Sequence, residues 1–171
     1  DLLVAYRSAI DGIGRHMQLL TLDLVGGVDV DGIRSASYAA VHQLQEWELS
    51  SCPLSTNDIS IDSDAHRWLV FETKSRIVQL DSQTQDAPTA IAEPFTETRQ
   101  KNPAIAFNAK GERLVVWGEA ISHARGGRLN LRLFDSEDQI QEIELEEAIT
   151  IPNYSFPAAA SLPNGDFLVL Y

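Results

Sequence analysis

Short apolar runs that end in an aromatic residue recur along the chain. There are four such runs, LLVAY, WLVF, LVVW and FLVLY, and their final residues are Tyr6, Phe71, Trp117 and Tyr171. The separations between successive final residues are 65, 46 and 54 positions. Short runs rich in Val and Leu, bounded by Asp, Arg and Gly, predict β-strands rather than helices. We therefore expect a protein built from similar strands at recurring intervals.

The residues before three of these runs align as well. Pro103 aligns with Pro157 and Gly111 with Gly165, and the segments PAIAF and PAAAS are each followed by a turn. This spacing predicts a hairpin of two short strands in which glycine supplies the positive φ of the turn. The third version, DSDAH at 62–66, lacks the glycine. The turn at 62–66 could therefore be of a different type.

A third strand is expected after each of the first three aromatic residues, Tyr6, Phe71 and Trp117. The segments MQLLTLD, RIVQLD and LNLRLFD all end in an aspartate, at Asp23, Asp81 and Asp135. A weaker fourth strand follows, in PTAIAE (88–93), in IQEIELE (140–146) and within 37–49. IQEIELE alternates apolar and polar side chains, as a half-buried edge strand does. The segment 37–49 also has helical spacing, so strand and helix both remain open there.

Four short antiparallel strands that recur along a chain are typical of a β-propeller. A β-sandwich also uses short strands, but it has no reason to repeat Pro-Ala-x-Ala and Leu-Val at fixed offsets. We predict an all-β fold in which 1–171 is a single β-propeller segment of about three and a half blades, an incomplete arc of a larger propeller. The blade copies span approximately 1–50, 56–94, 102–147 and 156–171.

The most regular copy, NPAIAFNAKGERLVVWGEA followed by LNLRLFD, resembles the repeat of large bacterial surface or secreted proteins. In that family a Pro-x-Val/Ala run, a Gly turn, a Val-Val-Trp strand and an Arg-x-Phe/Tyr-Asp strand recur many times. The resemblance is strong over 102–135 and 156–171 and weak over 1–56. The sequence departs from it at Asp58 and Ala65, where Ala and Gly are expected. It implies propeller-like repeats in an extracellular or cell-surface protein, with no common catalytic residues.

The composition limits the partners. The net charge of −12 disfavours nucleic acid and anionic membranes, and no apolar run approaches the roughly 20 residues of a membrane-spanning helix. The one cysteine, Cys52, excludes an internal disulfide. The chain begins at Asp1 inside an apolar run, as an excerpt of a longer polypeptide would. We expect adjacent blades or domains of a parent chain to cover the ends of the arc, because an exposed face of ~400 Å² would cost about 10 kcal/mol.

Two connections between second and third strands vary most in length. These loops, RSAIDGIGR (7–15) and GEAISHARGG (118–127), should share one face with the connections from fourth to first strands. Binding sites concentrate on loops that a rigid scaffold positions. The candidate binding residues on this face are Arg7, Asp11, Arg15, His123 and Arg125. A protein or a carbohydrate is the expected ligand.

Motifs for catalysis, metals and cofactors are missing. The four histidines are scattered without metal-ligand spacing, and DVDG (29–32) and DSD (62–64) contain only part of a calcium loop. We therefore expect no catalytic residue, no metal site and no cofactor. The favoured function is a non-catalytic recognition, adhesion or scaffold module. The alternative is an accessory part of a propeller-fold hydrolase or lyase whose catalytic residues lie outside this segment.

Overall fold

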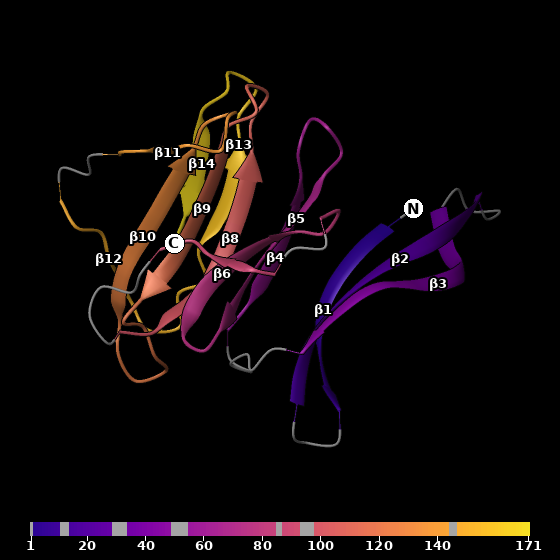
Figure 1. Cartoon of the computed structure of the whole chain (residues 1–171), viewed down its shortest axis with the longest axis horizontal. Helices are drawn as coiled ribbons and strands as arrows, with labels where there is room; N and C mark the ends of the chain where they lie inside the picture. Colours follow the sequence, from indigo (N-terminus) through magenta and orange to yellow (C-terminus); the bar gives the residue numbers. More distant parts are fainter. Residues whose placement is uncertain are drawn as a thin grey trace. The chain divides into compact units, whose positions relative to one another are not determined.

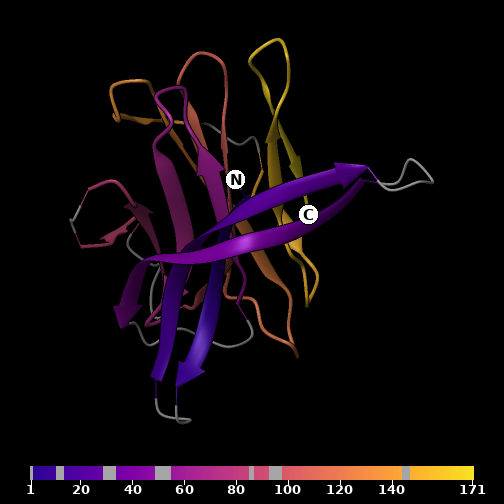
Figure 2. The same cartoon turned by 90° about the vertical axis from the view of Figure 1, so that its right-hand side faces the viewer.

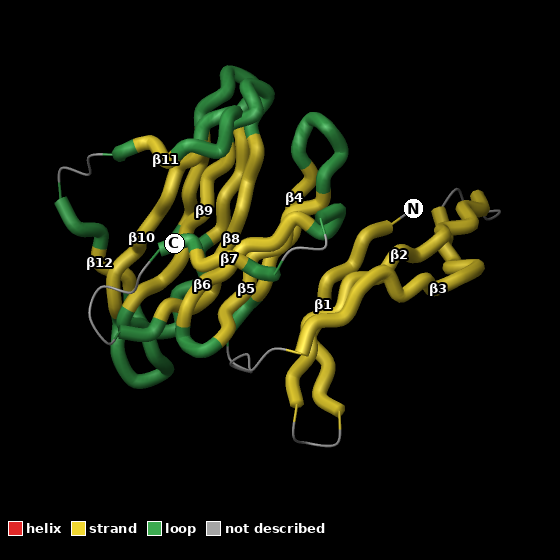
Figure 3. The backbone as a smooth tube through the Cα atoms, viewed as in Figure 1, coloured by secondary structure: helices red, strands yellow, loops and turns green. Residues whose placement is uncertain are grey.

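The computed structural model describes residues 2–10, 14–28, 34–48, 55–84, 87–92, 98–143 and 147–171, with the first three ranges described as backbone. Every regular element in these ranges is a β-strand (Figure 3). All strand pairs among them are antiparallel. The all-β prediction is confirmed. The chain divides into two compact units, residues 1–50 and 51–171, which are described separately. The described part of the chain contains no helix that is long and apolar enough to span a membrane.

The N-terminal unit is a sheet of three long strands, β1 (Leu2–Ile10), β2 (Gly14–Val28) and β3 (Arg34–Glu48), in that order (Figure 2). The register shifts twice between β2 and β3, after Leu19 and after Asp23. Such irregularities bend a sheet and increase its twist. Strand β3 covers residues 37–48 of the segment 37–49, for which strand and helix both remained possible, so strand is correct there.

The predicted loop at 7–15 is wrong in its extent. Strand β1 continues to Ile10 and β2 begins at Gly14, so the two strands pair from Leu2 opposite Leu22 to Ile10 opposite Gly14. In the longer antiparallel ladder, residues 7–10 and 14–15 make inter-strand backbone hydrogen bonds. In a nine-residue loop, their N–H and C=O groups would bond to water instead.

The second unit begins with a sheet of four strands in sequence order, β4 (Asn57–Ile61), β5 (Arg67–Thr73), β6 (Arg76–Asp81) and β7 (Thr89–Ala90). The next sheet follows the same order, with β8 (Gln100–Phe107), β9 (Arg113–Glu119), β10 (Gly127–Phe134) and β11 (Ile140–Gln141). Strand β12 (Thr150–Ile151) also pairs with β10. The last two strands, β13 (Ala158–Ser161) and β14 (Phe167–Leu170), form a hairpin (Figure 1).

The hairpins β4–β5, β8–β9 and β13–β14 share one turn geometry. In each, the fourth turn residue donates its backbone N–H to the carbonyl of the first, from Ala65 to Asp62, from Gly111 to Asn108 and from Gly165 to Leu162, at 3.2, 3.1 and 2.9 Å. The donors have φ values of 63°, 79° and 89°. The prediction of positive φ at both glycines is confirmed. The turn at 62–66 is of the same type, with Ala65 in the left-handed region where the other two have glycine.

Apolar side chains pack between successive sheets of this unit. One cluster joins Val70 and Ile77 of the first sheet to Ile105, Val115 and Trp117 of the second. Another joins Ala104, Leu114 and Val116 to side chains of β13 and β14. Strand β8 contacts both β4 and β13, so the first strand of each sheet lies beside the first strand of the next (Figure 1).

Polar groups also connect these sheets, beside the first strands. Asn102, at the irregularity in β8, donates its backbone N–H to Ser55 Oγ at 2.9 Å and its Nδ2 to the carbonyl of Ser155 at 2.9 Å. Its Oδ1 accepts the N–H of Thr56 at 3.2 Å. Asn102 is only 4% exposed and has φ of 55°, a conformation that asparagine tolerates better than most residues. One buried amide thus bridges three successive segments.

Candidate functional site

The predicted binding residues fall in both units. Arg7 lies on β1 opposite Met17, and Arg15 lies on β2 opposite Ala9. Asp11 lies outside the described residues. His123 and Arg125 lie on the loop between β9 and β10, as predicted, and both are exposed. The structure brings His123 and Arg125 together on one loop, and it describes Arg7 and Arg15 only within the N-terminal unit.

The loop at 120–126 is tied down by its own hydrogen bonds. Ser122 Oγ accepts the backbone N–H groups of Ala124 and Arg125 at 3.2 and 3.0 Å. Ile121 anchors the loop, because it is 3% exposed and packs with Leu129 and Ile151. The loop is thus fixed on both sides of His123, and a fixed loop loses less entropy on binding.

This loop lies beside the connection that leads to β13, as the sequence predicted. Asn153 Nδ2 donates to the carbonyl of His123 at 3.2 Å. Arg125 and Arg128 line a cavity of about 760 Å³ together with Ala148 and Thr150. His123 lines a smaller cavity of about 150 Å³, next to Tyr154 and Phe156, two aromatic residues that are 61% and 55% exposed.

A buried carboxylate stands in the wall of the larger cavity. Glu119 is 4% exposed, and it accepts hydrogen bonds from Thr98 Oγ1 at 2.7 Å and from Asn130 Nδ2. These bonds fix Glu119 and compensate for its loss of hydration. Arg125 and Arg128 also line this cavity and are exposed, so the cavity combines a fixed carboxylate with two solvent-exposed cations.

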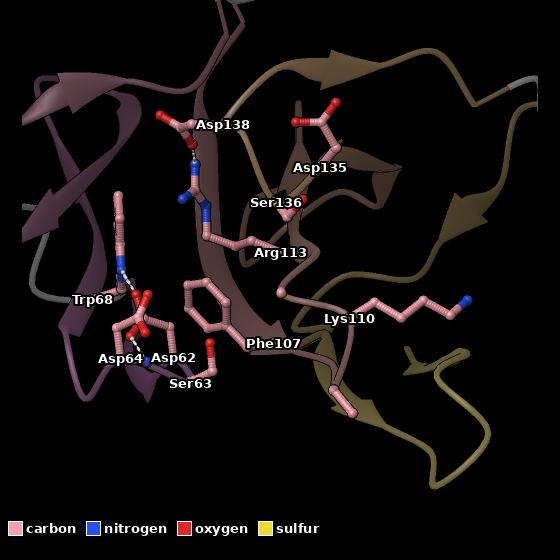
Figure 4. Close-up of a pocket in the computed structure, with 12 residues that line it drawn as sticks. Asp62, Ser63, Asp64, Trp68, Phe107, Lys110, Arg113, Asp135, Ser136 and Asp138 are labelled. Atoms are coloured by element: carbon pink, nitrogen blue, oxygen red, sulfur yellow. Dashed lines mark hydrogen bonds and ion pairs between the residues drawn. The ribbon is translucent and has the colours of Figure 1, made fainter.

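A separate cavity of about 360 Å³ lies where the turns of two sheets meet (Figure 4). The turn at 62–66, the turn at 108–112 and the turn at 135–139 form its rim. The residues that line this turn cavity are Asp62, Ser63, Asp64, Trp68, Phe107, Ala109, Lys110, Gly111, Arg113, Asp135, Ser136 and Asp138.

Arg113 is the buried cation among the residues that line the turn cavity. Its guanidinium lies 4.1 Å from the ring centres of both Trp68 and Phe134, within the range of cation–π attraction. Its Nη2 donates to Asp138 Oδ1 at 2.5 Å, and its side chain is 4% exposed while that of Asp138 is 59% exposed. Burial lowers the pKa of Arg113, and the charge of Asp138 opposes this shift. The guanidinium is therefore a desolvated cation with one carboxylate partner.

Asp62 also lines the turn cavity. Its Oδ1 accepts the backbone N–H groups of Asp64 and His66 at 3.0 and 2.8 Å, and its Oδ2 accepts Trp68 Nε1 at 3.0 Å. Burial by itself raises the pKa of Asp62, but these hydrogen bonds, with a smaller contribution from the charge of His66, outweigh it and hold the pKa below its usual 3.8. Asp62 therefore fixes both the turn and the Trp68 ring.

The sequence did not indicate the turn cavity. Its rim depends on Asp62, Asn108 and Asp135, each of which accepts two backbone N–H groups of its own turn through Oδ1. An Asp or Asn at the first position of a turn is a known local signal, but it says nothing about which turns meet. Among the described residues, no group of three or more His, Cys, Asp or Glu side chains is placed to hold a metal ion.

No protein-family model matches the chain, and comparisons with curated proteins and with solved structures give no significant match.

Proposed function

We propose that the three sheets of residues 55–171 are successive blades of a β-propeller. Two of them have the sequential order of four antiparallel strands that a propeller blade has. Strands β4, β8 and β13 would line the central axis, and their mutual contacts support this. The shared turn geometry of the three hairpins supports a repeated unit. Strands β1, β2 and β3 would be the second, third and fourth strands of the first copy.

The exposed side of the last hairpin supports a further blade as partner. Leu114 and Val116 are 3% and 0% exposed because β13 and β14 cover them. The aligned residues Leu168 and Leu170 are 45% and 61% exposed. Under this proposal, the first and second strands of another blade cover Leu168 and Leu170, as β13 and β14 cover the blade before.

The proposed function is non-catalytic recognition or adhesion, in an extracellular or cell-surface protein. The observation behind it is the anchored loop at 120–126, which presents His123 and Arg125 beside two cavities. In a chain of net charge −12, the exposed Arg125 and Arg128 give this cavity a local positive charge. A protein or carbohydrate that offers carboxylate or hydroxyl oxygens fits such a surface.

The experiment measures binding of the full chain to immobilised acidic and neutral polysaccharides and to purified cell-surface proteins. We expect at least one probe to bind, and the double variant His123→Ser, Arg125→Ser to weaken it by about tenfold, a loss of about 1.4 kcal/mol. Ile121 and Ser122 are kept so that the loop stays anchored. Glu142→Ser, an exposed residue that lines none of the three cavities, is the control and should bind as the wild type does. Failure of every probe, or equal binding by the double variant, would overturn the proposal.

A further inference from the structure

The polar groups of the turn cavity are mostly arranged for a neutral partner. Four carboxylates and two cations line it, and three of these carboxylates already accept hydrogen bonds within the protein. The carboxylate of Asp62 accepts three hydrogen bonds. The carboxylate of Asp135 accepts two from backbone N–H groups and one from Gln141 Nε2, the last at 2.6 Å. Asp138 pairs with Arg113. An incoming cation would meet a single further carboxylate, Asp64, beside three that already hold protein donors, and an incoming anion would be repelled by all four.

The remaining groups are those that bind hydroxyls. Ser63, Asp64 and Ser136 are exposed at the rim, and two of them are hydroxyls that both donate and accept. Figure 4 shows the half-buried ring of Phe107 at the centre of these polar side chains. Such a ring offers an apolar surface to the C–H face of a sugar, while the side chains around it bind the hydroxyls at its edge. Ligand pockets commonly join an apolar wall to a few placed polar groups.

Arg113 supplies an independent observation. Its Nε is buried without a hydrogen-bond partner, although its side chain lines the cavity. A buried donor without an acceptor is costly and calls for an explanation. Asp138 occupies Nη2 and leaves Nε without a partner, so the ion pair stays intact when a ligand oxygen reaches Nε. A ligand hydroxyl that enters there would accept this hydrogen bond without bringing a charge.

We propose that the turn cavity binds one or two units of a neutral saccharide, with a sugar ring against Phe107 and its hydroxyls on Asp64, Ser136 and Arg113. A volume of about 360 Å³ lies at the small end of the range for ligand pockets. This site is distinct from the loop cavity beside Arg125, because the two share no lining residue. The inference therefore stands or falls independently of the function proposed above.

The experiment titrates the full chain with neutral methyl glycosides and disaccharides of glucose, galactose, mannose and N-acetylglucosamine. The readout is the indole N–H signal of Trp68 in NMR, since this group donates to Asp62 at the cavity wall. We expect at least one saccharide to shift it at millimolar concentration while the buried Trp117 signal stays in place. No shift with any saccharide up to about 50 mM would overturn the proposal.

Matched variants and charged probes test the assignment. Asp64→Ala removes an exposed acceptor but leaves its backbone bond to Asp62, and it should weaken saccharide binding about fivefold or more. Glu142→Ala, an exposed residue that lines none of the three cavities, should bind the saccharide unchanged. Equal binding by Asp64→Ala, or a Trp68 shift with N-acetyl-lysine methyl ester or inorganic phosphate instead of saccharide, would overturn it.

Discussion

Asp58 on β4 holds the backbone of Ile105 on β8, with its Oδ2 accepting the Ile105 N–H at 2.9 Å across two sheets. Its Oδ1 accepts the N–H of Ile59 at 2.8 Å. The aligned positions in the other hairpins are Ala104 and Ala158, so aspartate here is the departure that the sequence pattern left unexplained. The structure gives the reason, because the carboxylate provides an acceptor for a buried N–H of the neighbouring sheet.

Removing this carboxylate should destabilise the fold, because both of its hydrogen bonds are lost. Asp58→Ala restores the residue of the aligned positions but leaves the N–H of Ile105 without its acceptor, and Ile105 is 3% exposed. We expect a loss of about 1–3 kcal/mol in the free energy of unfolding, measured by urea denaturation. Glu137→Ala, in an exposed turn, is the control and should change the stability by less than about 0.5 kcal/mol. A stabilised Asp58→Ala variant would show that the cross-sheet bond is not needed.

The shared turn geometry predicts opposite effects for two substitutions. Ala65 has φ of 63° where the aligned Gly111 has 79°, so Ala65→Gly relieves left-handed strain and should stabilise the chain by up to about 1 kcal/mol. Gly111→Ala should destabilise it by about 1 kcal/mol or more, because its Cβ would also lie 3.3 Å from Ser136 Cβ. Thermal unfolding of both variants is the measurement. A destabilised Ala65→Gly variant would contradict the strain argument.

The two aromatic rings around Arg113 predict that lysine is a worse replacement than methionine. Arg113→Lys keeps a charge but loses the planar stack on Trp68 and Phe134, and it buries a strongly hydrated ammonium. We expect it to cost about 2 kcal/mol. Arg113→Met removes the buried charge and leaves Asp138 to water, so its cost should stay within about 1 kcal/mol. Chemical denaturation gives both values, and the reverse order would mean that the charge itself stabilises the fold.

The low pKa of Asp62 predicts a pH-dependent contribution to stability. A carboxyl whose pKa is depressed in the folded state stabilises fully above its unfolded value of 3.8 and loses this effect as the pH falls through the folded pKa. Asp62→Asn keeps an acceptor for the turn, as Asn108 does in the aligned hairpin, but not the charge. The melting temperature of the wild type should therefore exceed that of Asp62→Asn at pH 7, and the gap should narrow below pH 3.8. A gap independent of pH would refute this assignment.

Removing the buried side-chain amide of Asn102 should destabilise the fold more than removing the exposed amide of Asn164. Asn102→Gly tolerates the φ of 55° but removes the contacts to Thr56 and Ser155. We expect a loss of about 2–3 kcal/mol, since two backbone groups lose their partner at once. Asn164→Gly, whose side chain bonds only within an exposed turn, is the matched control. Similar stabilities for both variants would rule out a bridging role for Asn102.

Much of the local structure could be predicted from the sequence. The runs around Phe71 and Trp117 became β5 and β9, and PTAIAE gave the short β7. IQEIELE gave only Ile140–Gln141 as strand β11 within its described residues. The type of the turn at 62–66 does not follow from its sequence, because glycine is the usual signal for positive φ and Ala65 adopts it under the hydrogen bonds of Asp62. The loop at 7–15 was predicted too long, because variation in spacing does not distinguish a longer loop from longer strands.

The amino-acid sequence by itself determined most of the strands and the two glycine turns, because apolar alternation and turn chemistry act over a few neighbouring residues. It also placed His123 and Arg125 on a loop. Only the tertiary structure decided which turns meet, and with that the turn cavity, the stacking of Arg113 on Trp68 and the bond from Asp58 to Ile105. These contacts join residues more than 40 positions apart, and their energies depend on burial that no local pattern encodes.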